Sequence, residues 1–195
     1  MASDGCNFSR TDAMNWFGKV LNSSAKEMTN SLGVLKAPSK TLFLPYLGGE
    51  RTPHNDAQIR ASFINLDHNA DRETMIRAVI EGVSFAFRDC FDALSSTGTK
   101  INQLVAVGGG AKSEYWVQSI ATTLGLPISI PVEGDYGGAF GAARLGMIAY
   151  GINRDEVTIS PKIKHIVEPV MSLHEDYVSA LKSYRKTYKA LKAIT

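Results

Sequence analysis

A glycine-rich turn between a predicted strand and a predicted helix is the first candidate for chemistry. The apolar run Leu104–Val107 leads into Gly108, Gly109 and Gly110, and a helix follows from Ser113. Glycines after a strand let the backbone approach a ligand without a Cβ in the way, and they tolerate a positive φ. The helix start offers unpaired N–H groups to the polar edges or phosphates of a nucleotide. A tight turn that binds nothing explains the same residues equally well.

Spacing excludes two well-known glycine signatures for this turn. A P-loop requires G-x-x-x-x-G-K-[ST], and the residues from Gly108 to Glu114 do not follow that pattern. A dinucleotide-binding turn requires G-x-G-x-x-G, and Ser113 stands here at the place of the third glycine. A nucleotide function of this turn therefore has to rest on other features.

A second polar loop, Gly48–Asp56, follows a short apolar segment. Glu50, Arg51 and His54 stand in it behind two glycines, and loops dense in such groups at a strand end often line a site. Glu50 and Arg51 can equally be solvated, and His54 can be held by a single hydrogen bond. Judged from the residues alone, a loop without a binding role is favoured over a loop that lines a site.

Two further helices carry patterns that resemble binding elements. After Gly137 and Gly138, a helix rich in alanine and glycine predicts close packing against a neighbouring backbone, which is compatible with a hinge between domains. The last helix, about 172–193, has one apolar face and one basic face. Because no stacking aromatic residues interleave with the basic ones, the basic face indicates a solvated stripe rather than an anion-binding surface.

Composition narrows the classes of protein. With 195 residues, 44% of them hydrophobic, the chain can bury a real core, and a net charge of +2 gives no global reason to bind nucleic acid or an anionic membrane. Two cysteines and four scattered histidines form neither a disulfide framework nor a zinc site. The amino terminus lacks the pattern of a signal peptide, and no apolar run is long enough to span a membrane. We therefore expect a cytoplasmic protein.

The elements that must position these loops follow from periodicity and from capping residues. Apolar residues at helical spacing predict a long, mostly core-facing helix over 71–95, which begins at Asp71. A polar stretch over 22–40 reads as a link. Alternating helices and strands indicate an α/β layered domain. The other expected elements are helices from Ser9, over 113–124, from 137 to about 151 and over 172–193, and strands over 41–47, 104–107 and 128–132.

Four segments in order resemble one family. The segments Leu44–Asn55, Arg77–Val83, Gly108–Trp116 and Gly137–Leu145 are similar to the carboxy-terminal half of the FGGY carbohydrate kinases. The Gly-Glu-Arg-Thr-Pro-His stretch is most similar to the xylulokinases of that family. Each motif is weak by itself, whereas four in the expected order are specific. The resemblance implies an α/β ribonuclease-H-like (actin-like ATPase) domain, a mixed sheet flanked by helices, expected here to be incomplete at its amino-terminal end.

The resemblance also assigns residues to a nucleotide site. In the family, the glycine-rich turn receives the adenosine part of ATP, and a second loop borders the phosphates. This chain has Glu114 where many relatives have Asn, and Ala61 where relatives commonly have Gly. By match, the adenosine turn comprises Gly108, Gly109, Gly110, Ala111, Ser113 and Glu114, and the phosphate-side loop comprises Gly48, Gly49 and Arg51.

The family's mechanism needs two domains. Its catalytic aspartate and most of its sugar contacts lie in an amino-terminal domain, so the resemblance implies that residues 1–195 form the carboxy-terminal, nucleotide-side domain, without a catalytic residue or a metal ligand. The implied full-length enzyme phosphorylates D-xylulose to D-xylulose 5-phosphate with ATP and Mg²⁺. The expected partners of this chain are ATP, the sugar and its own amino-terminal domain, with no nucleic acid and no membrane.

Alternatives stay open at this point. The sugar can instead be gluconate, ribulose or glycerol, and the chain can be a nucleotide-binding module without a catalytic partner. A homodimer is also compatible with the sequence.

Overall fold

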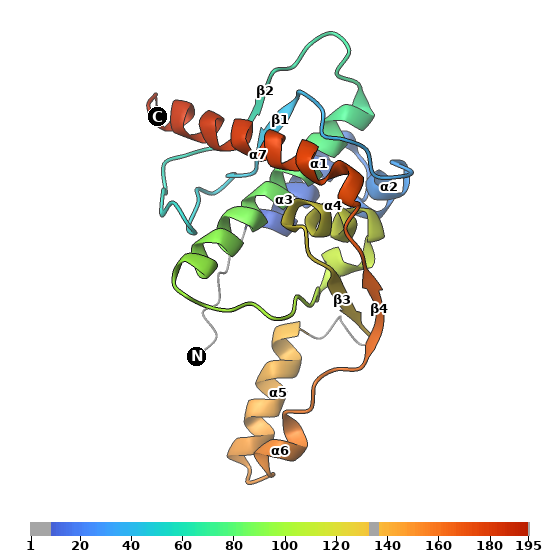
Figure 1. The fold of residues 1–195 in the computed structure, drawn as a ribbon, viewed down its shortest axis with the longest axis vertical. Coiled ribbons are helices and arrows are strands. Elements are labelled where there is room, and N and C mark those ends of the chain that lie inside the picture. Colours follow the sequence, from blue (N-terminus) through green and yellow to red (C-terminus); the bar gives the residue numbers. More distant parts are fainter. Residues whose placement is uncertain (1–8, 133–136, 195) are drawn as a thin grey trace.

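The structure, a computed structural model, describes residues 9–132 and 137–194, which form helices and two separate short β-sheets (Figure 1). Residues 1–8, on which the expectation of no signal peptide rests, lie outside the described residues. The elements are α1 (Ser9–Leu21), α2 (Ala25–Asn30), β1 (Leu42–Leu44), β2 (Ser62–Ile64), α3 (Arg72–Ser96), η1 (Gly109–Lys112), α4 (Glu114–Leu124), β3 (Ile128–Pro131), α5 (Gly137–Ala149), α6 (Arg154–Val157), β4 (Ile163–Val167) and α7 (Met171–Lys192).

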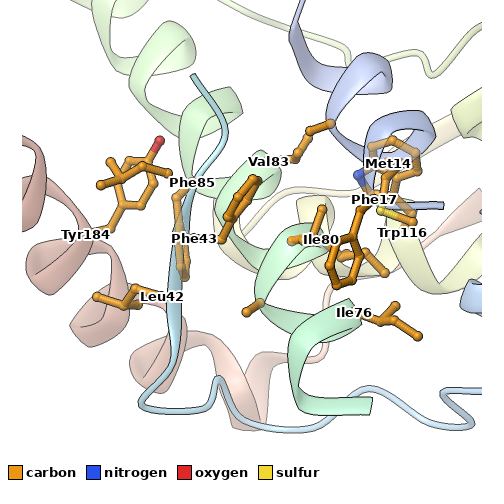
Figure 2. Packing of buried hydrophobic residues seen from close by; sticks show 14 of the residues in the cluster. Met14, Phe17, Leu42, Phe43, Ile76, Ile80, Val83, Phe85, Trp116 and Tyr184 are labelled. Carbon is orange, nitrogen blue, oxygen red and sulfur yellow. The ribbon is translucent and has the colours of Figure 1, made fainter. Parts of the chain in front are cut away.

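Helix α3 runs through the centre of the molecule, and its apolar stripe packs into the main core together with residues of α1, α2, β1, α4 and α7. The helix starts where it was predicted to start, and Asp71 is its cap, because the Asp71 side chain accepts a hydrogen bond from the Thr74 N–H at 2.8 Å. Strand β1 lies directly against this helix at Gly82, where a Cβ would stand only 2.1 Å from the Phe43 carbonyl oxygen. Figure 2 shows Phe43 among the buried side chains of α3. The glycine therefore sets how closely helix and strand approach.

Each of the two sheets contains two strands. Strands β1 and β2 pair antiparallel, with Phe43 opposite Phe63. Strands β3 and β4 also pair antiparallel, with Ser129 opposite Ile166. Val105 adds one isolated parallel bridge to Ser129, so a larger mixed sheet, as the resemblance implies, is not formed by the strands of the described residues.

The expected strand over 104–107 is wrong in extent. It pairs with β3 only through the Val105–Ser129 bridge, in which the Ser129 N–H donates to the Leu104 carbonyl at 2.9 Å. Val105 and Val107 expose their side chains, whereas Leu104 and Ala106 pack on the second core cluster. An apolar run favours a strand, but a ladder forms only where a partner backbone lies alongside it.

The small-residue helix forms, but close packing of it against the rest of the described residues is wrong, while a role as a hinge between domains stays a prediction. Helix α5 contacts α6 and stands away from the rest of the chain in Figure 1. A Cβ added at Gly138, Gly141 or Gly146 would meet nothing within 4 Å. Small residues allow a neighbouring backbone to come close, but they do not supply that neighbour.

The stretch over 22–40 is not only a link. It contains α2, which opens with a complete capping box: the Ser24 side chain accepts from the Glu27 N–H, and the Glu27 carboxylate accepts from the Ser24 N–H. Strands β2 and β4 and helix α6 were likewise not expected. They are three to five residues long, which is too short for a periodic pattern to stand out.

Candidate functional site

The glycine turn forms where the sequence predicts it. Gly108 has a φ of 84°, a conformation that side-chain-bearing residues rarely adopt, and it leads the chain into η1. Ser113 then caps α4, because its hydroxyl accepts a hydrogen bond from the Trp116 N–H at 3.3 Å. The turn thus brings an exposed backbone segment to the positive end of α4.

A cavity of about 460 Å³ opens between this turn and the two amino-terminal helices. Pockets of this size hold small organic ligands, which are usually fixed by a few polar groups in a mostly apolar lining. Both kinds of group are present here. The lining residues are Met14, Asn15, Ala25, Lys26, Thr29, Asn30, Gly109, Gly110, Lys112, Ser113 and Trp116.

The glycines of the turn leave backbone open toward this cavity. A Cβ at Gly109 would meet nothing within 4 Å, so no protein contact requires a glycine there. A Cβ at Gly110 would meet the Trp116 ring at 3.5 Å, an ordinary contact. Of the residues assigned to the adenosine site, Gly109, Gly110 and Ser113 line this cavity, whereas Glu114 is exposed and does not line it.

A second cavity, about 360 Å³, lies on the other side of the turn. Gly108 to Ala111 line it together with apolar side chains of residues 104–107 and of α4. Trp116 lines both cavities and therefore stands between them. Figure 2 shows its ring beside Met14 and Phe17 of α1. Its buried Nε1 has no hydrogen-bond partner in the part of the chain that the structure describes.

Residues of α1 and α2 are the part of this site that sequence reasoning missed. Asn15 on α1 supplies an amide to the cavity, and Thr29 and Asn30 supply a hydroxyl and an amide from the stretch over 22–40 that was predicted to be a link. The Ser24–Glu27 capping box was a signal that could have revealed α2. No local pattern places α2 beside a turn some 80 positions later in the chain.

The loop Gly48–Asp56 is held by a buried carboxylate. Glu50 is 4% exposed, and its carboxylate accepts hydrogen bonds from the N–H groups of Thr52 at 3.0 Å and His54 at 2.9 Å. Gly49 has a φ of 87°, and a Cβ there would press on the Ala57 backbone at 3.0 Å. Gly48 and Arg51 are exposed. Glu50 is thus a structural residue of the loop, and Gly49 is required by its backbone conformation.

Helix α7 fastens this loop to α3. His54 stacks on Tyr188, with ring centroids 3.7 Å apart, and the Tyr188 hydroxyl donates to Asp56 at 3.1 Å. The sequence predicted that the basic residues of this helix form a solvated face. Arg185 does not belong to such a face, because it pairs with Asp89 at 2.6 Å. Burial lowers the pKa of His54, and burial raises the pKa of Asp89 against the opposing effect of Arg185. These contacts order the loop.

The structure does not bring the two predicted loops together. In Figure 1 the loop of residues 48–56 lies near the carboxyl end of α7, and the glycine turn lies below α4. Neither cavity beside the glycine turn includes a residue of the loop. A third cavity, about 590 Å³, is lined by residues of the 37–42 segment, of 65–67 and of α7, and it adjoins neither loop.

Residues 9–132 and 137–194 contain no candidate metal centre: within these ranges, no group of three or more His, Cys, Asp or Glu side chains is placed to hold a metal ion. Within the same ranges, no helix combines the length and the apolar character that crossing a bilayer requires.

Comparison with known proteins identifies the family. Residues 3–150 match the family described as "FGGY family of carbohydrate kinases, C-terminal domain". The chain belongs to the FGGY family. The match includes both predicted loops and α3, so the resemblance based on four motifs is confirmed.

Individual FGGY kinases agree with this assignment. The chain is 37% identical over 153 residues to the xylulose kinase of Escherichia coli, covering 76% of this chain and 31% of that protein. It superposes on the xyloylose (xylulose) kinase of Brucella ovis with a TM-score of 0.87 and 46% identity, covering 95% of this chain and 39% of that one. A gluconate kinase of Lactobacillus acidophilus gives a TM-score of 0.78 and 30% identity, covering 92% and 37%.

The FGGY relatives establish the fold class and show how much of a full-length relative this chain covers. The predicted actin-like ATPase fold is confirmed by the superpositions on sugar kinases of this family. The chain spans about a third of the length of the curated relatives it matches. The nucleotide roles assigned to the two loops, and the division into domains, stay predictions.

Proposed function

We propose that this chain is the nucleotide-side part of an ATP-dependent sugar kinase, and that the cavity between the glycine turn and α1–α2 receives the adenosine part of ATP. The observation that carries the proposal is this cavity of about 460 Å³, bounded by the turn that resembles the family's nucleotide turn. Family membership supports the kinase class.

The lining suits an adenosine group. Trp116 and Ala25 contribute apolar lining for a flat base, while Asn15 and Asn30 are exposed and carry amides that can both donate and accept hydrogen bonds. The open backbone at Gly109 can approach the ligand closely. In this arrangement, the chain's own residues bind and orient the nucleotide.

Phosphoryl transfer needs more than the residues that line this cavity. It depends mainly on positioning and on stabilising charge around the transferred group. We assign the catalytic base and most sugar contacts to an amino-terminal domain, and Mg²⁺ to the phosphates of the nucleotide. The loop with Gly48, Gly49 and Arg51 has the weaker claim to a phosphate role, because it shares no cavity with the turn. The chain alone is therefore expected to bind nucleotide weakly and to transfer no phosphoryl group.

The proposed substrate of the whole enzyme is D-xylulose. Relatives named xylulose kinase support it, and the gluconate kinase of Lactobacillus acidophilus is the reason for a second candidate, gluconate. A coupled assay of the full-length enzyme with a panel of sugars and polyols distinguishes these substrates. A cytoplasmic location and a homodimer stay predictions.

The nucleotide site is tested by filling it. Gly109→Leu places a side chain where no protein atom stands in the way, so the fold should persist while ADP binding, measured by calorimetry, falls at least about tenfold. Gly141→Leu, in α5, is the matched control, because a Cβ there also meets nothing within 4 Å. Equal affinity of Gly109→Leu and the control would contradict the assignment. Phosphorylation of xylulose by the 195-residue chain would contradict its dependence on a second domain.

A further inference from the structure

Trp116 joins the start of α4 to the main core. It is the third residue of that helix, and its N–H donates to the Ser113 hydroxyl that caps the helix. The side chain is 5% exposed and belongs to the main core cluster. Its ring lies beside Met14 and Phe17 of α1 in Figure 2. The helix that follows the glycine turn is therefore packed, through this ring, against a helix that borders the 460 Å³ cavity.

The outer edge of the same ring faces Gly110 in the glycine turn. A Cβ built at Gly110 would stand 3.5 Å from Cζ3, 3.7 Å from Cε3 and 3.9 Å from Cη2 of Trp116. These are the nearest heavy atoms outside the residues adjacent to Gly110, so the open side of this glycine is turned toward the ring. Both residues also line the two cavities beside the turn. The ring thus fills the space between Gly110 and α1.

The size of the indole decides this contact. Among the described residues, the buried Nε1 of Trp116 has no hydrogen-bond partner, and an unpaired buried donor costs free energy. Phenylalanine would fill much of the same apolar space without that cost. It would not support Gly110 in the same way, because Cζ3 and Cη2 belong to the outer part of the six-membered ring, which a phenyl group is too short to replace. The contact with Gly110 is what the larger ring provides.

We propose that Trp116 is a positioning residue of the glycine turn, and that its indole ring fixes the distance between Gly110 and α1. The turn has two hydrogen bonds of its own, from the Ala111 N–H to the Gly108 carbonyl and from the Ser113 N–H to the Gly110 carbonyl. These bonds hold its shape but not its place relative to α1. A cavity held at the width of the ligand spares binding the cost of ordering its walls. The binding part of this inference rests on the proposed function.

The first experiment is a double-mutant cycle on ADP affinity, measured by calorimetry. Trp116→Phe should weaken binding, and Gly110→Ala, whose Cβ points into the gap left by the indole, should restore part of the loss. We expect a coupling between these two changes of at least about threefold in affinity. Gly109→Ala is the matched control, because its Cβ meets nothing within 4 Å, and its effect should be the same with and without Trp116→Phe. Equal coupling of Trp116→Phe to both glycines overturns the proposal.

The second experiment needs no nucleotide. The amides of Ala111 and Ser113, which are hydrogen-bonded inside the turn, should exchange at least about threefold faster in Trp116→Phe than in Phe85→Leu. Phe85 is the control because it is a buried aromatic residue of the same core cluster that packs against Tyr184 of α7. Equal exchange in the two variants overturns the positioning role. If the wild type binds no ADP, the proposed nucleotide site fails, and the exchange result decides the positioning role separately.

The third experiment keeps Trp116 and is therefore informative even if Trp116→Phe does not fold. Trp16→Phe removes the other tryptophan of the chain, so that the remaining indole emission comes from Trp116 alone. Because the ring of Trp116 lines the cavity, ADP should change this emission with the half-saturation that calorimetry gives. Binding seen by calorimetry without a change in emission overturns the proposal.

Discussion

Replacing Gly82 with alanine tests the closest contact in the core. The added Cβ would stand 2.1 Å from the Phe43 carbonyl oxygen and 3.0 Å from its carbon, and both are backbone atoms that cannot rotate away. To relieve the contact, α3 and β1 must separate until the Cβ–oxygen distance exceeds 3.0 Å. Overpacking typically costs about 1–3 kcal/mol, and this rigid contact belongs at the upper end, near 3. Alanine has a higher helix propensity than glycine, and this offsets about 1 kcal/mol of the loss in the free energy of unfolding.

The expected net loss for Gly82→Ala is thus about 2 kcal/mol in the free energy of unfolding. Urea unfolding followed by circular dichroism measures it as a lower midpoint at unchanged slope. Gly141→Ala is the control, because its Cβ meets nothing within 4 Å and only the gain in helix propensity remains. If Gly82→Ala is as stable as the wild type, the reasoning from the α3–β1 contact is refuted.

Three further changes test other parts of the molecule. Ser113→Ala removes the cap of α4 and should cost about 1 kcal/mol in urea unfolding and weaken ADP binding in calorimetry; unchanged affinity would contradict a role for the helix start. Tyr188→Phe removes the hydrogen bond to Asp56 and should cost about 1 kcal/mol, with faster hydrogen exchange over residues 48–56. Because burial raises the pKa of Glu81 on α3 to about 7, folded Glu81 binds its proton more tightly than unfolded Glu81; stability should fall by up to about 3 kcal/mol as pH rises from 4.5 to about 7, and Glu81→Gln should lack this fall in unfolding titrations.

Local signals in the sequence were sufficient to predict the longer helices. The apolar stripe of α3 and its cap at Asp71 are both present. The helix predicted over 113–124 ends as expected, and Gly125 directly after it adopts the left-handed conformation with a φ of 70°. These features depend on residues a few positions apart, which is why a single sequence reveals them.

Contacts between distant segments could not be derived in the same way. Arg185 reads as one more residue of a basic stripe until the structure places it 2.6 Å from Asp89, 96 positions earlier in the chain. The same holds for Asn15 and Asn30, which become candidate ligand contacts only because α1 and α2 lie beside the glycine turn. Which face of a helix meets which loop is decided by packing of the whole chain, and no spacing rule encodes it.

The outward-facing residues near the second sheet bear on how the chain behaves in solution. Val105, Val107 and Ile166 expose apolar side chains, and Phe140 and Leu145 do so on α5. Exposed apolar surface next to a short strand edge favours association between molecules. Self-association of this kind makes a melting temperature depend on protein concentration. Thermal midpoints of the 195-residue chain are therefore comparable only when they are measured at the same dilution.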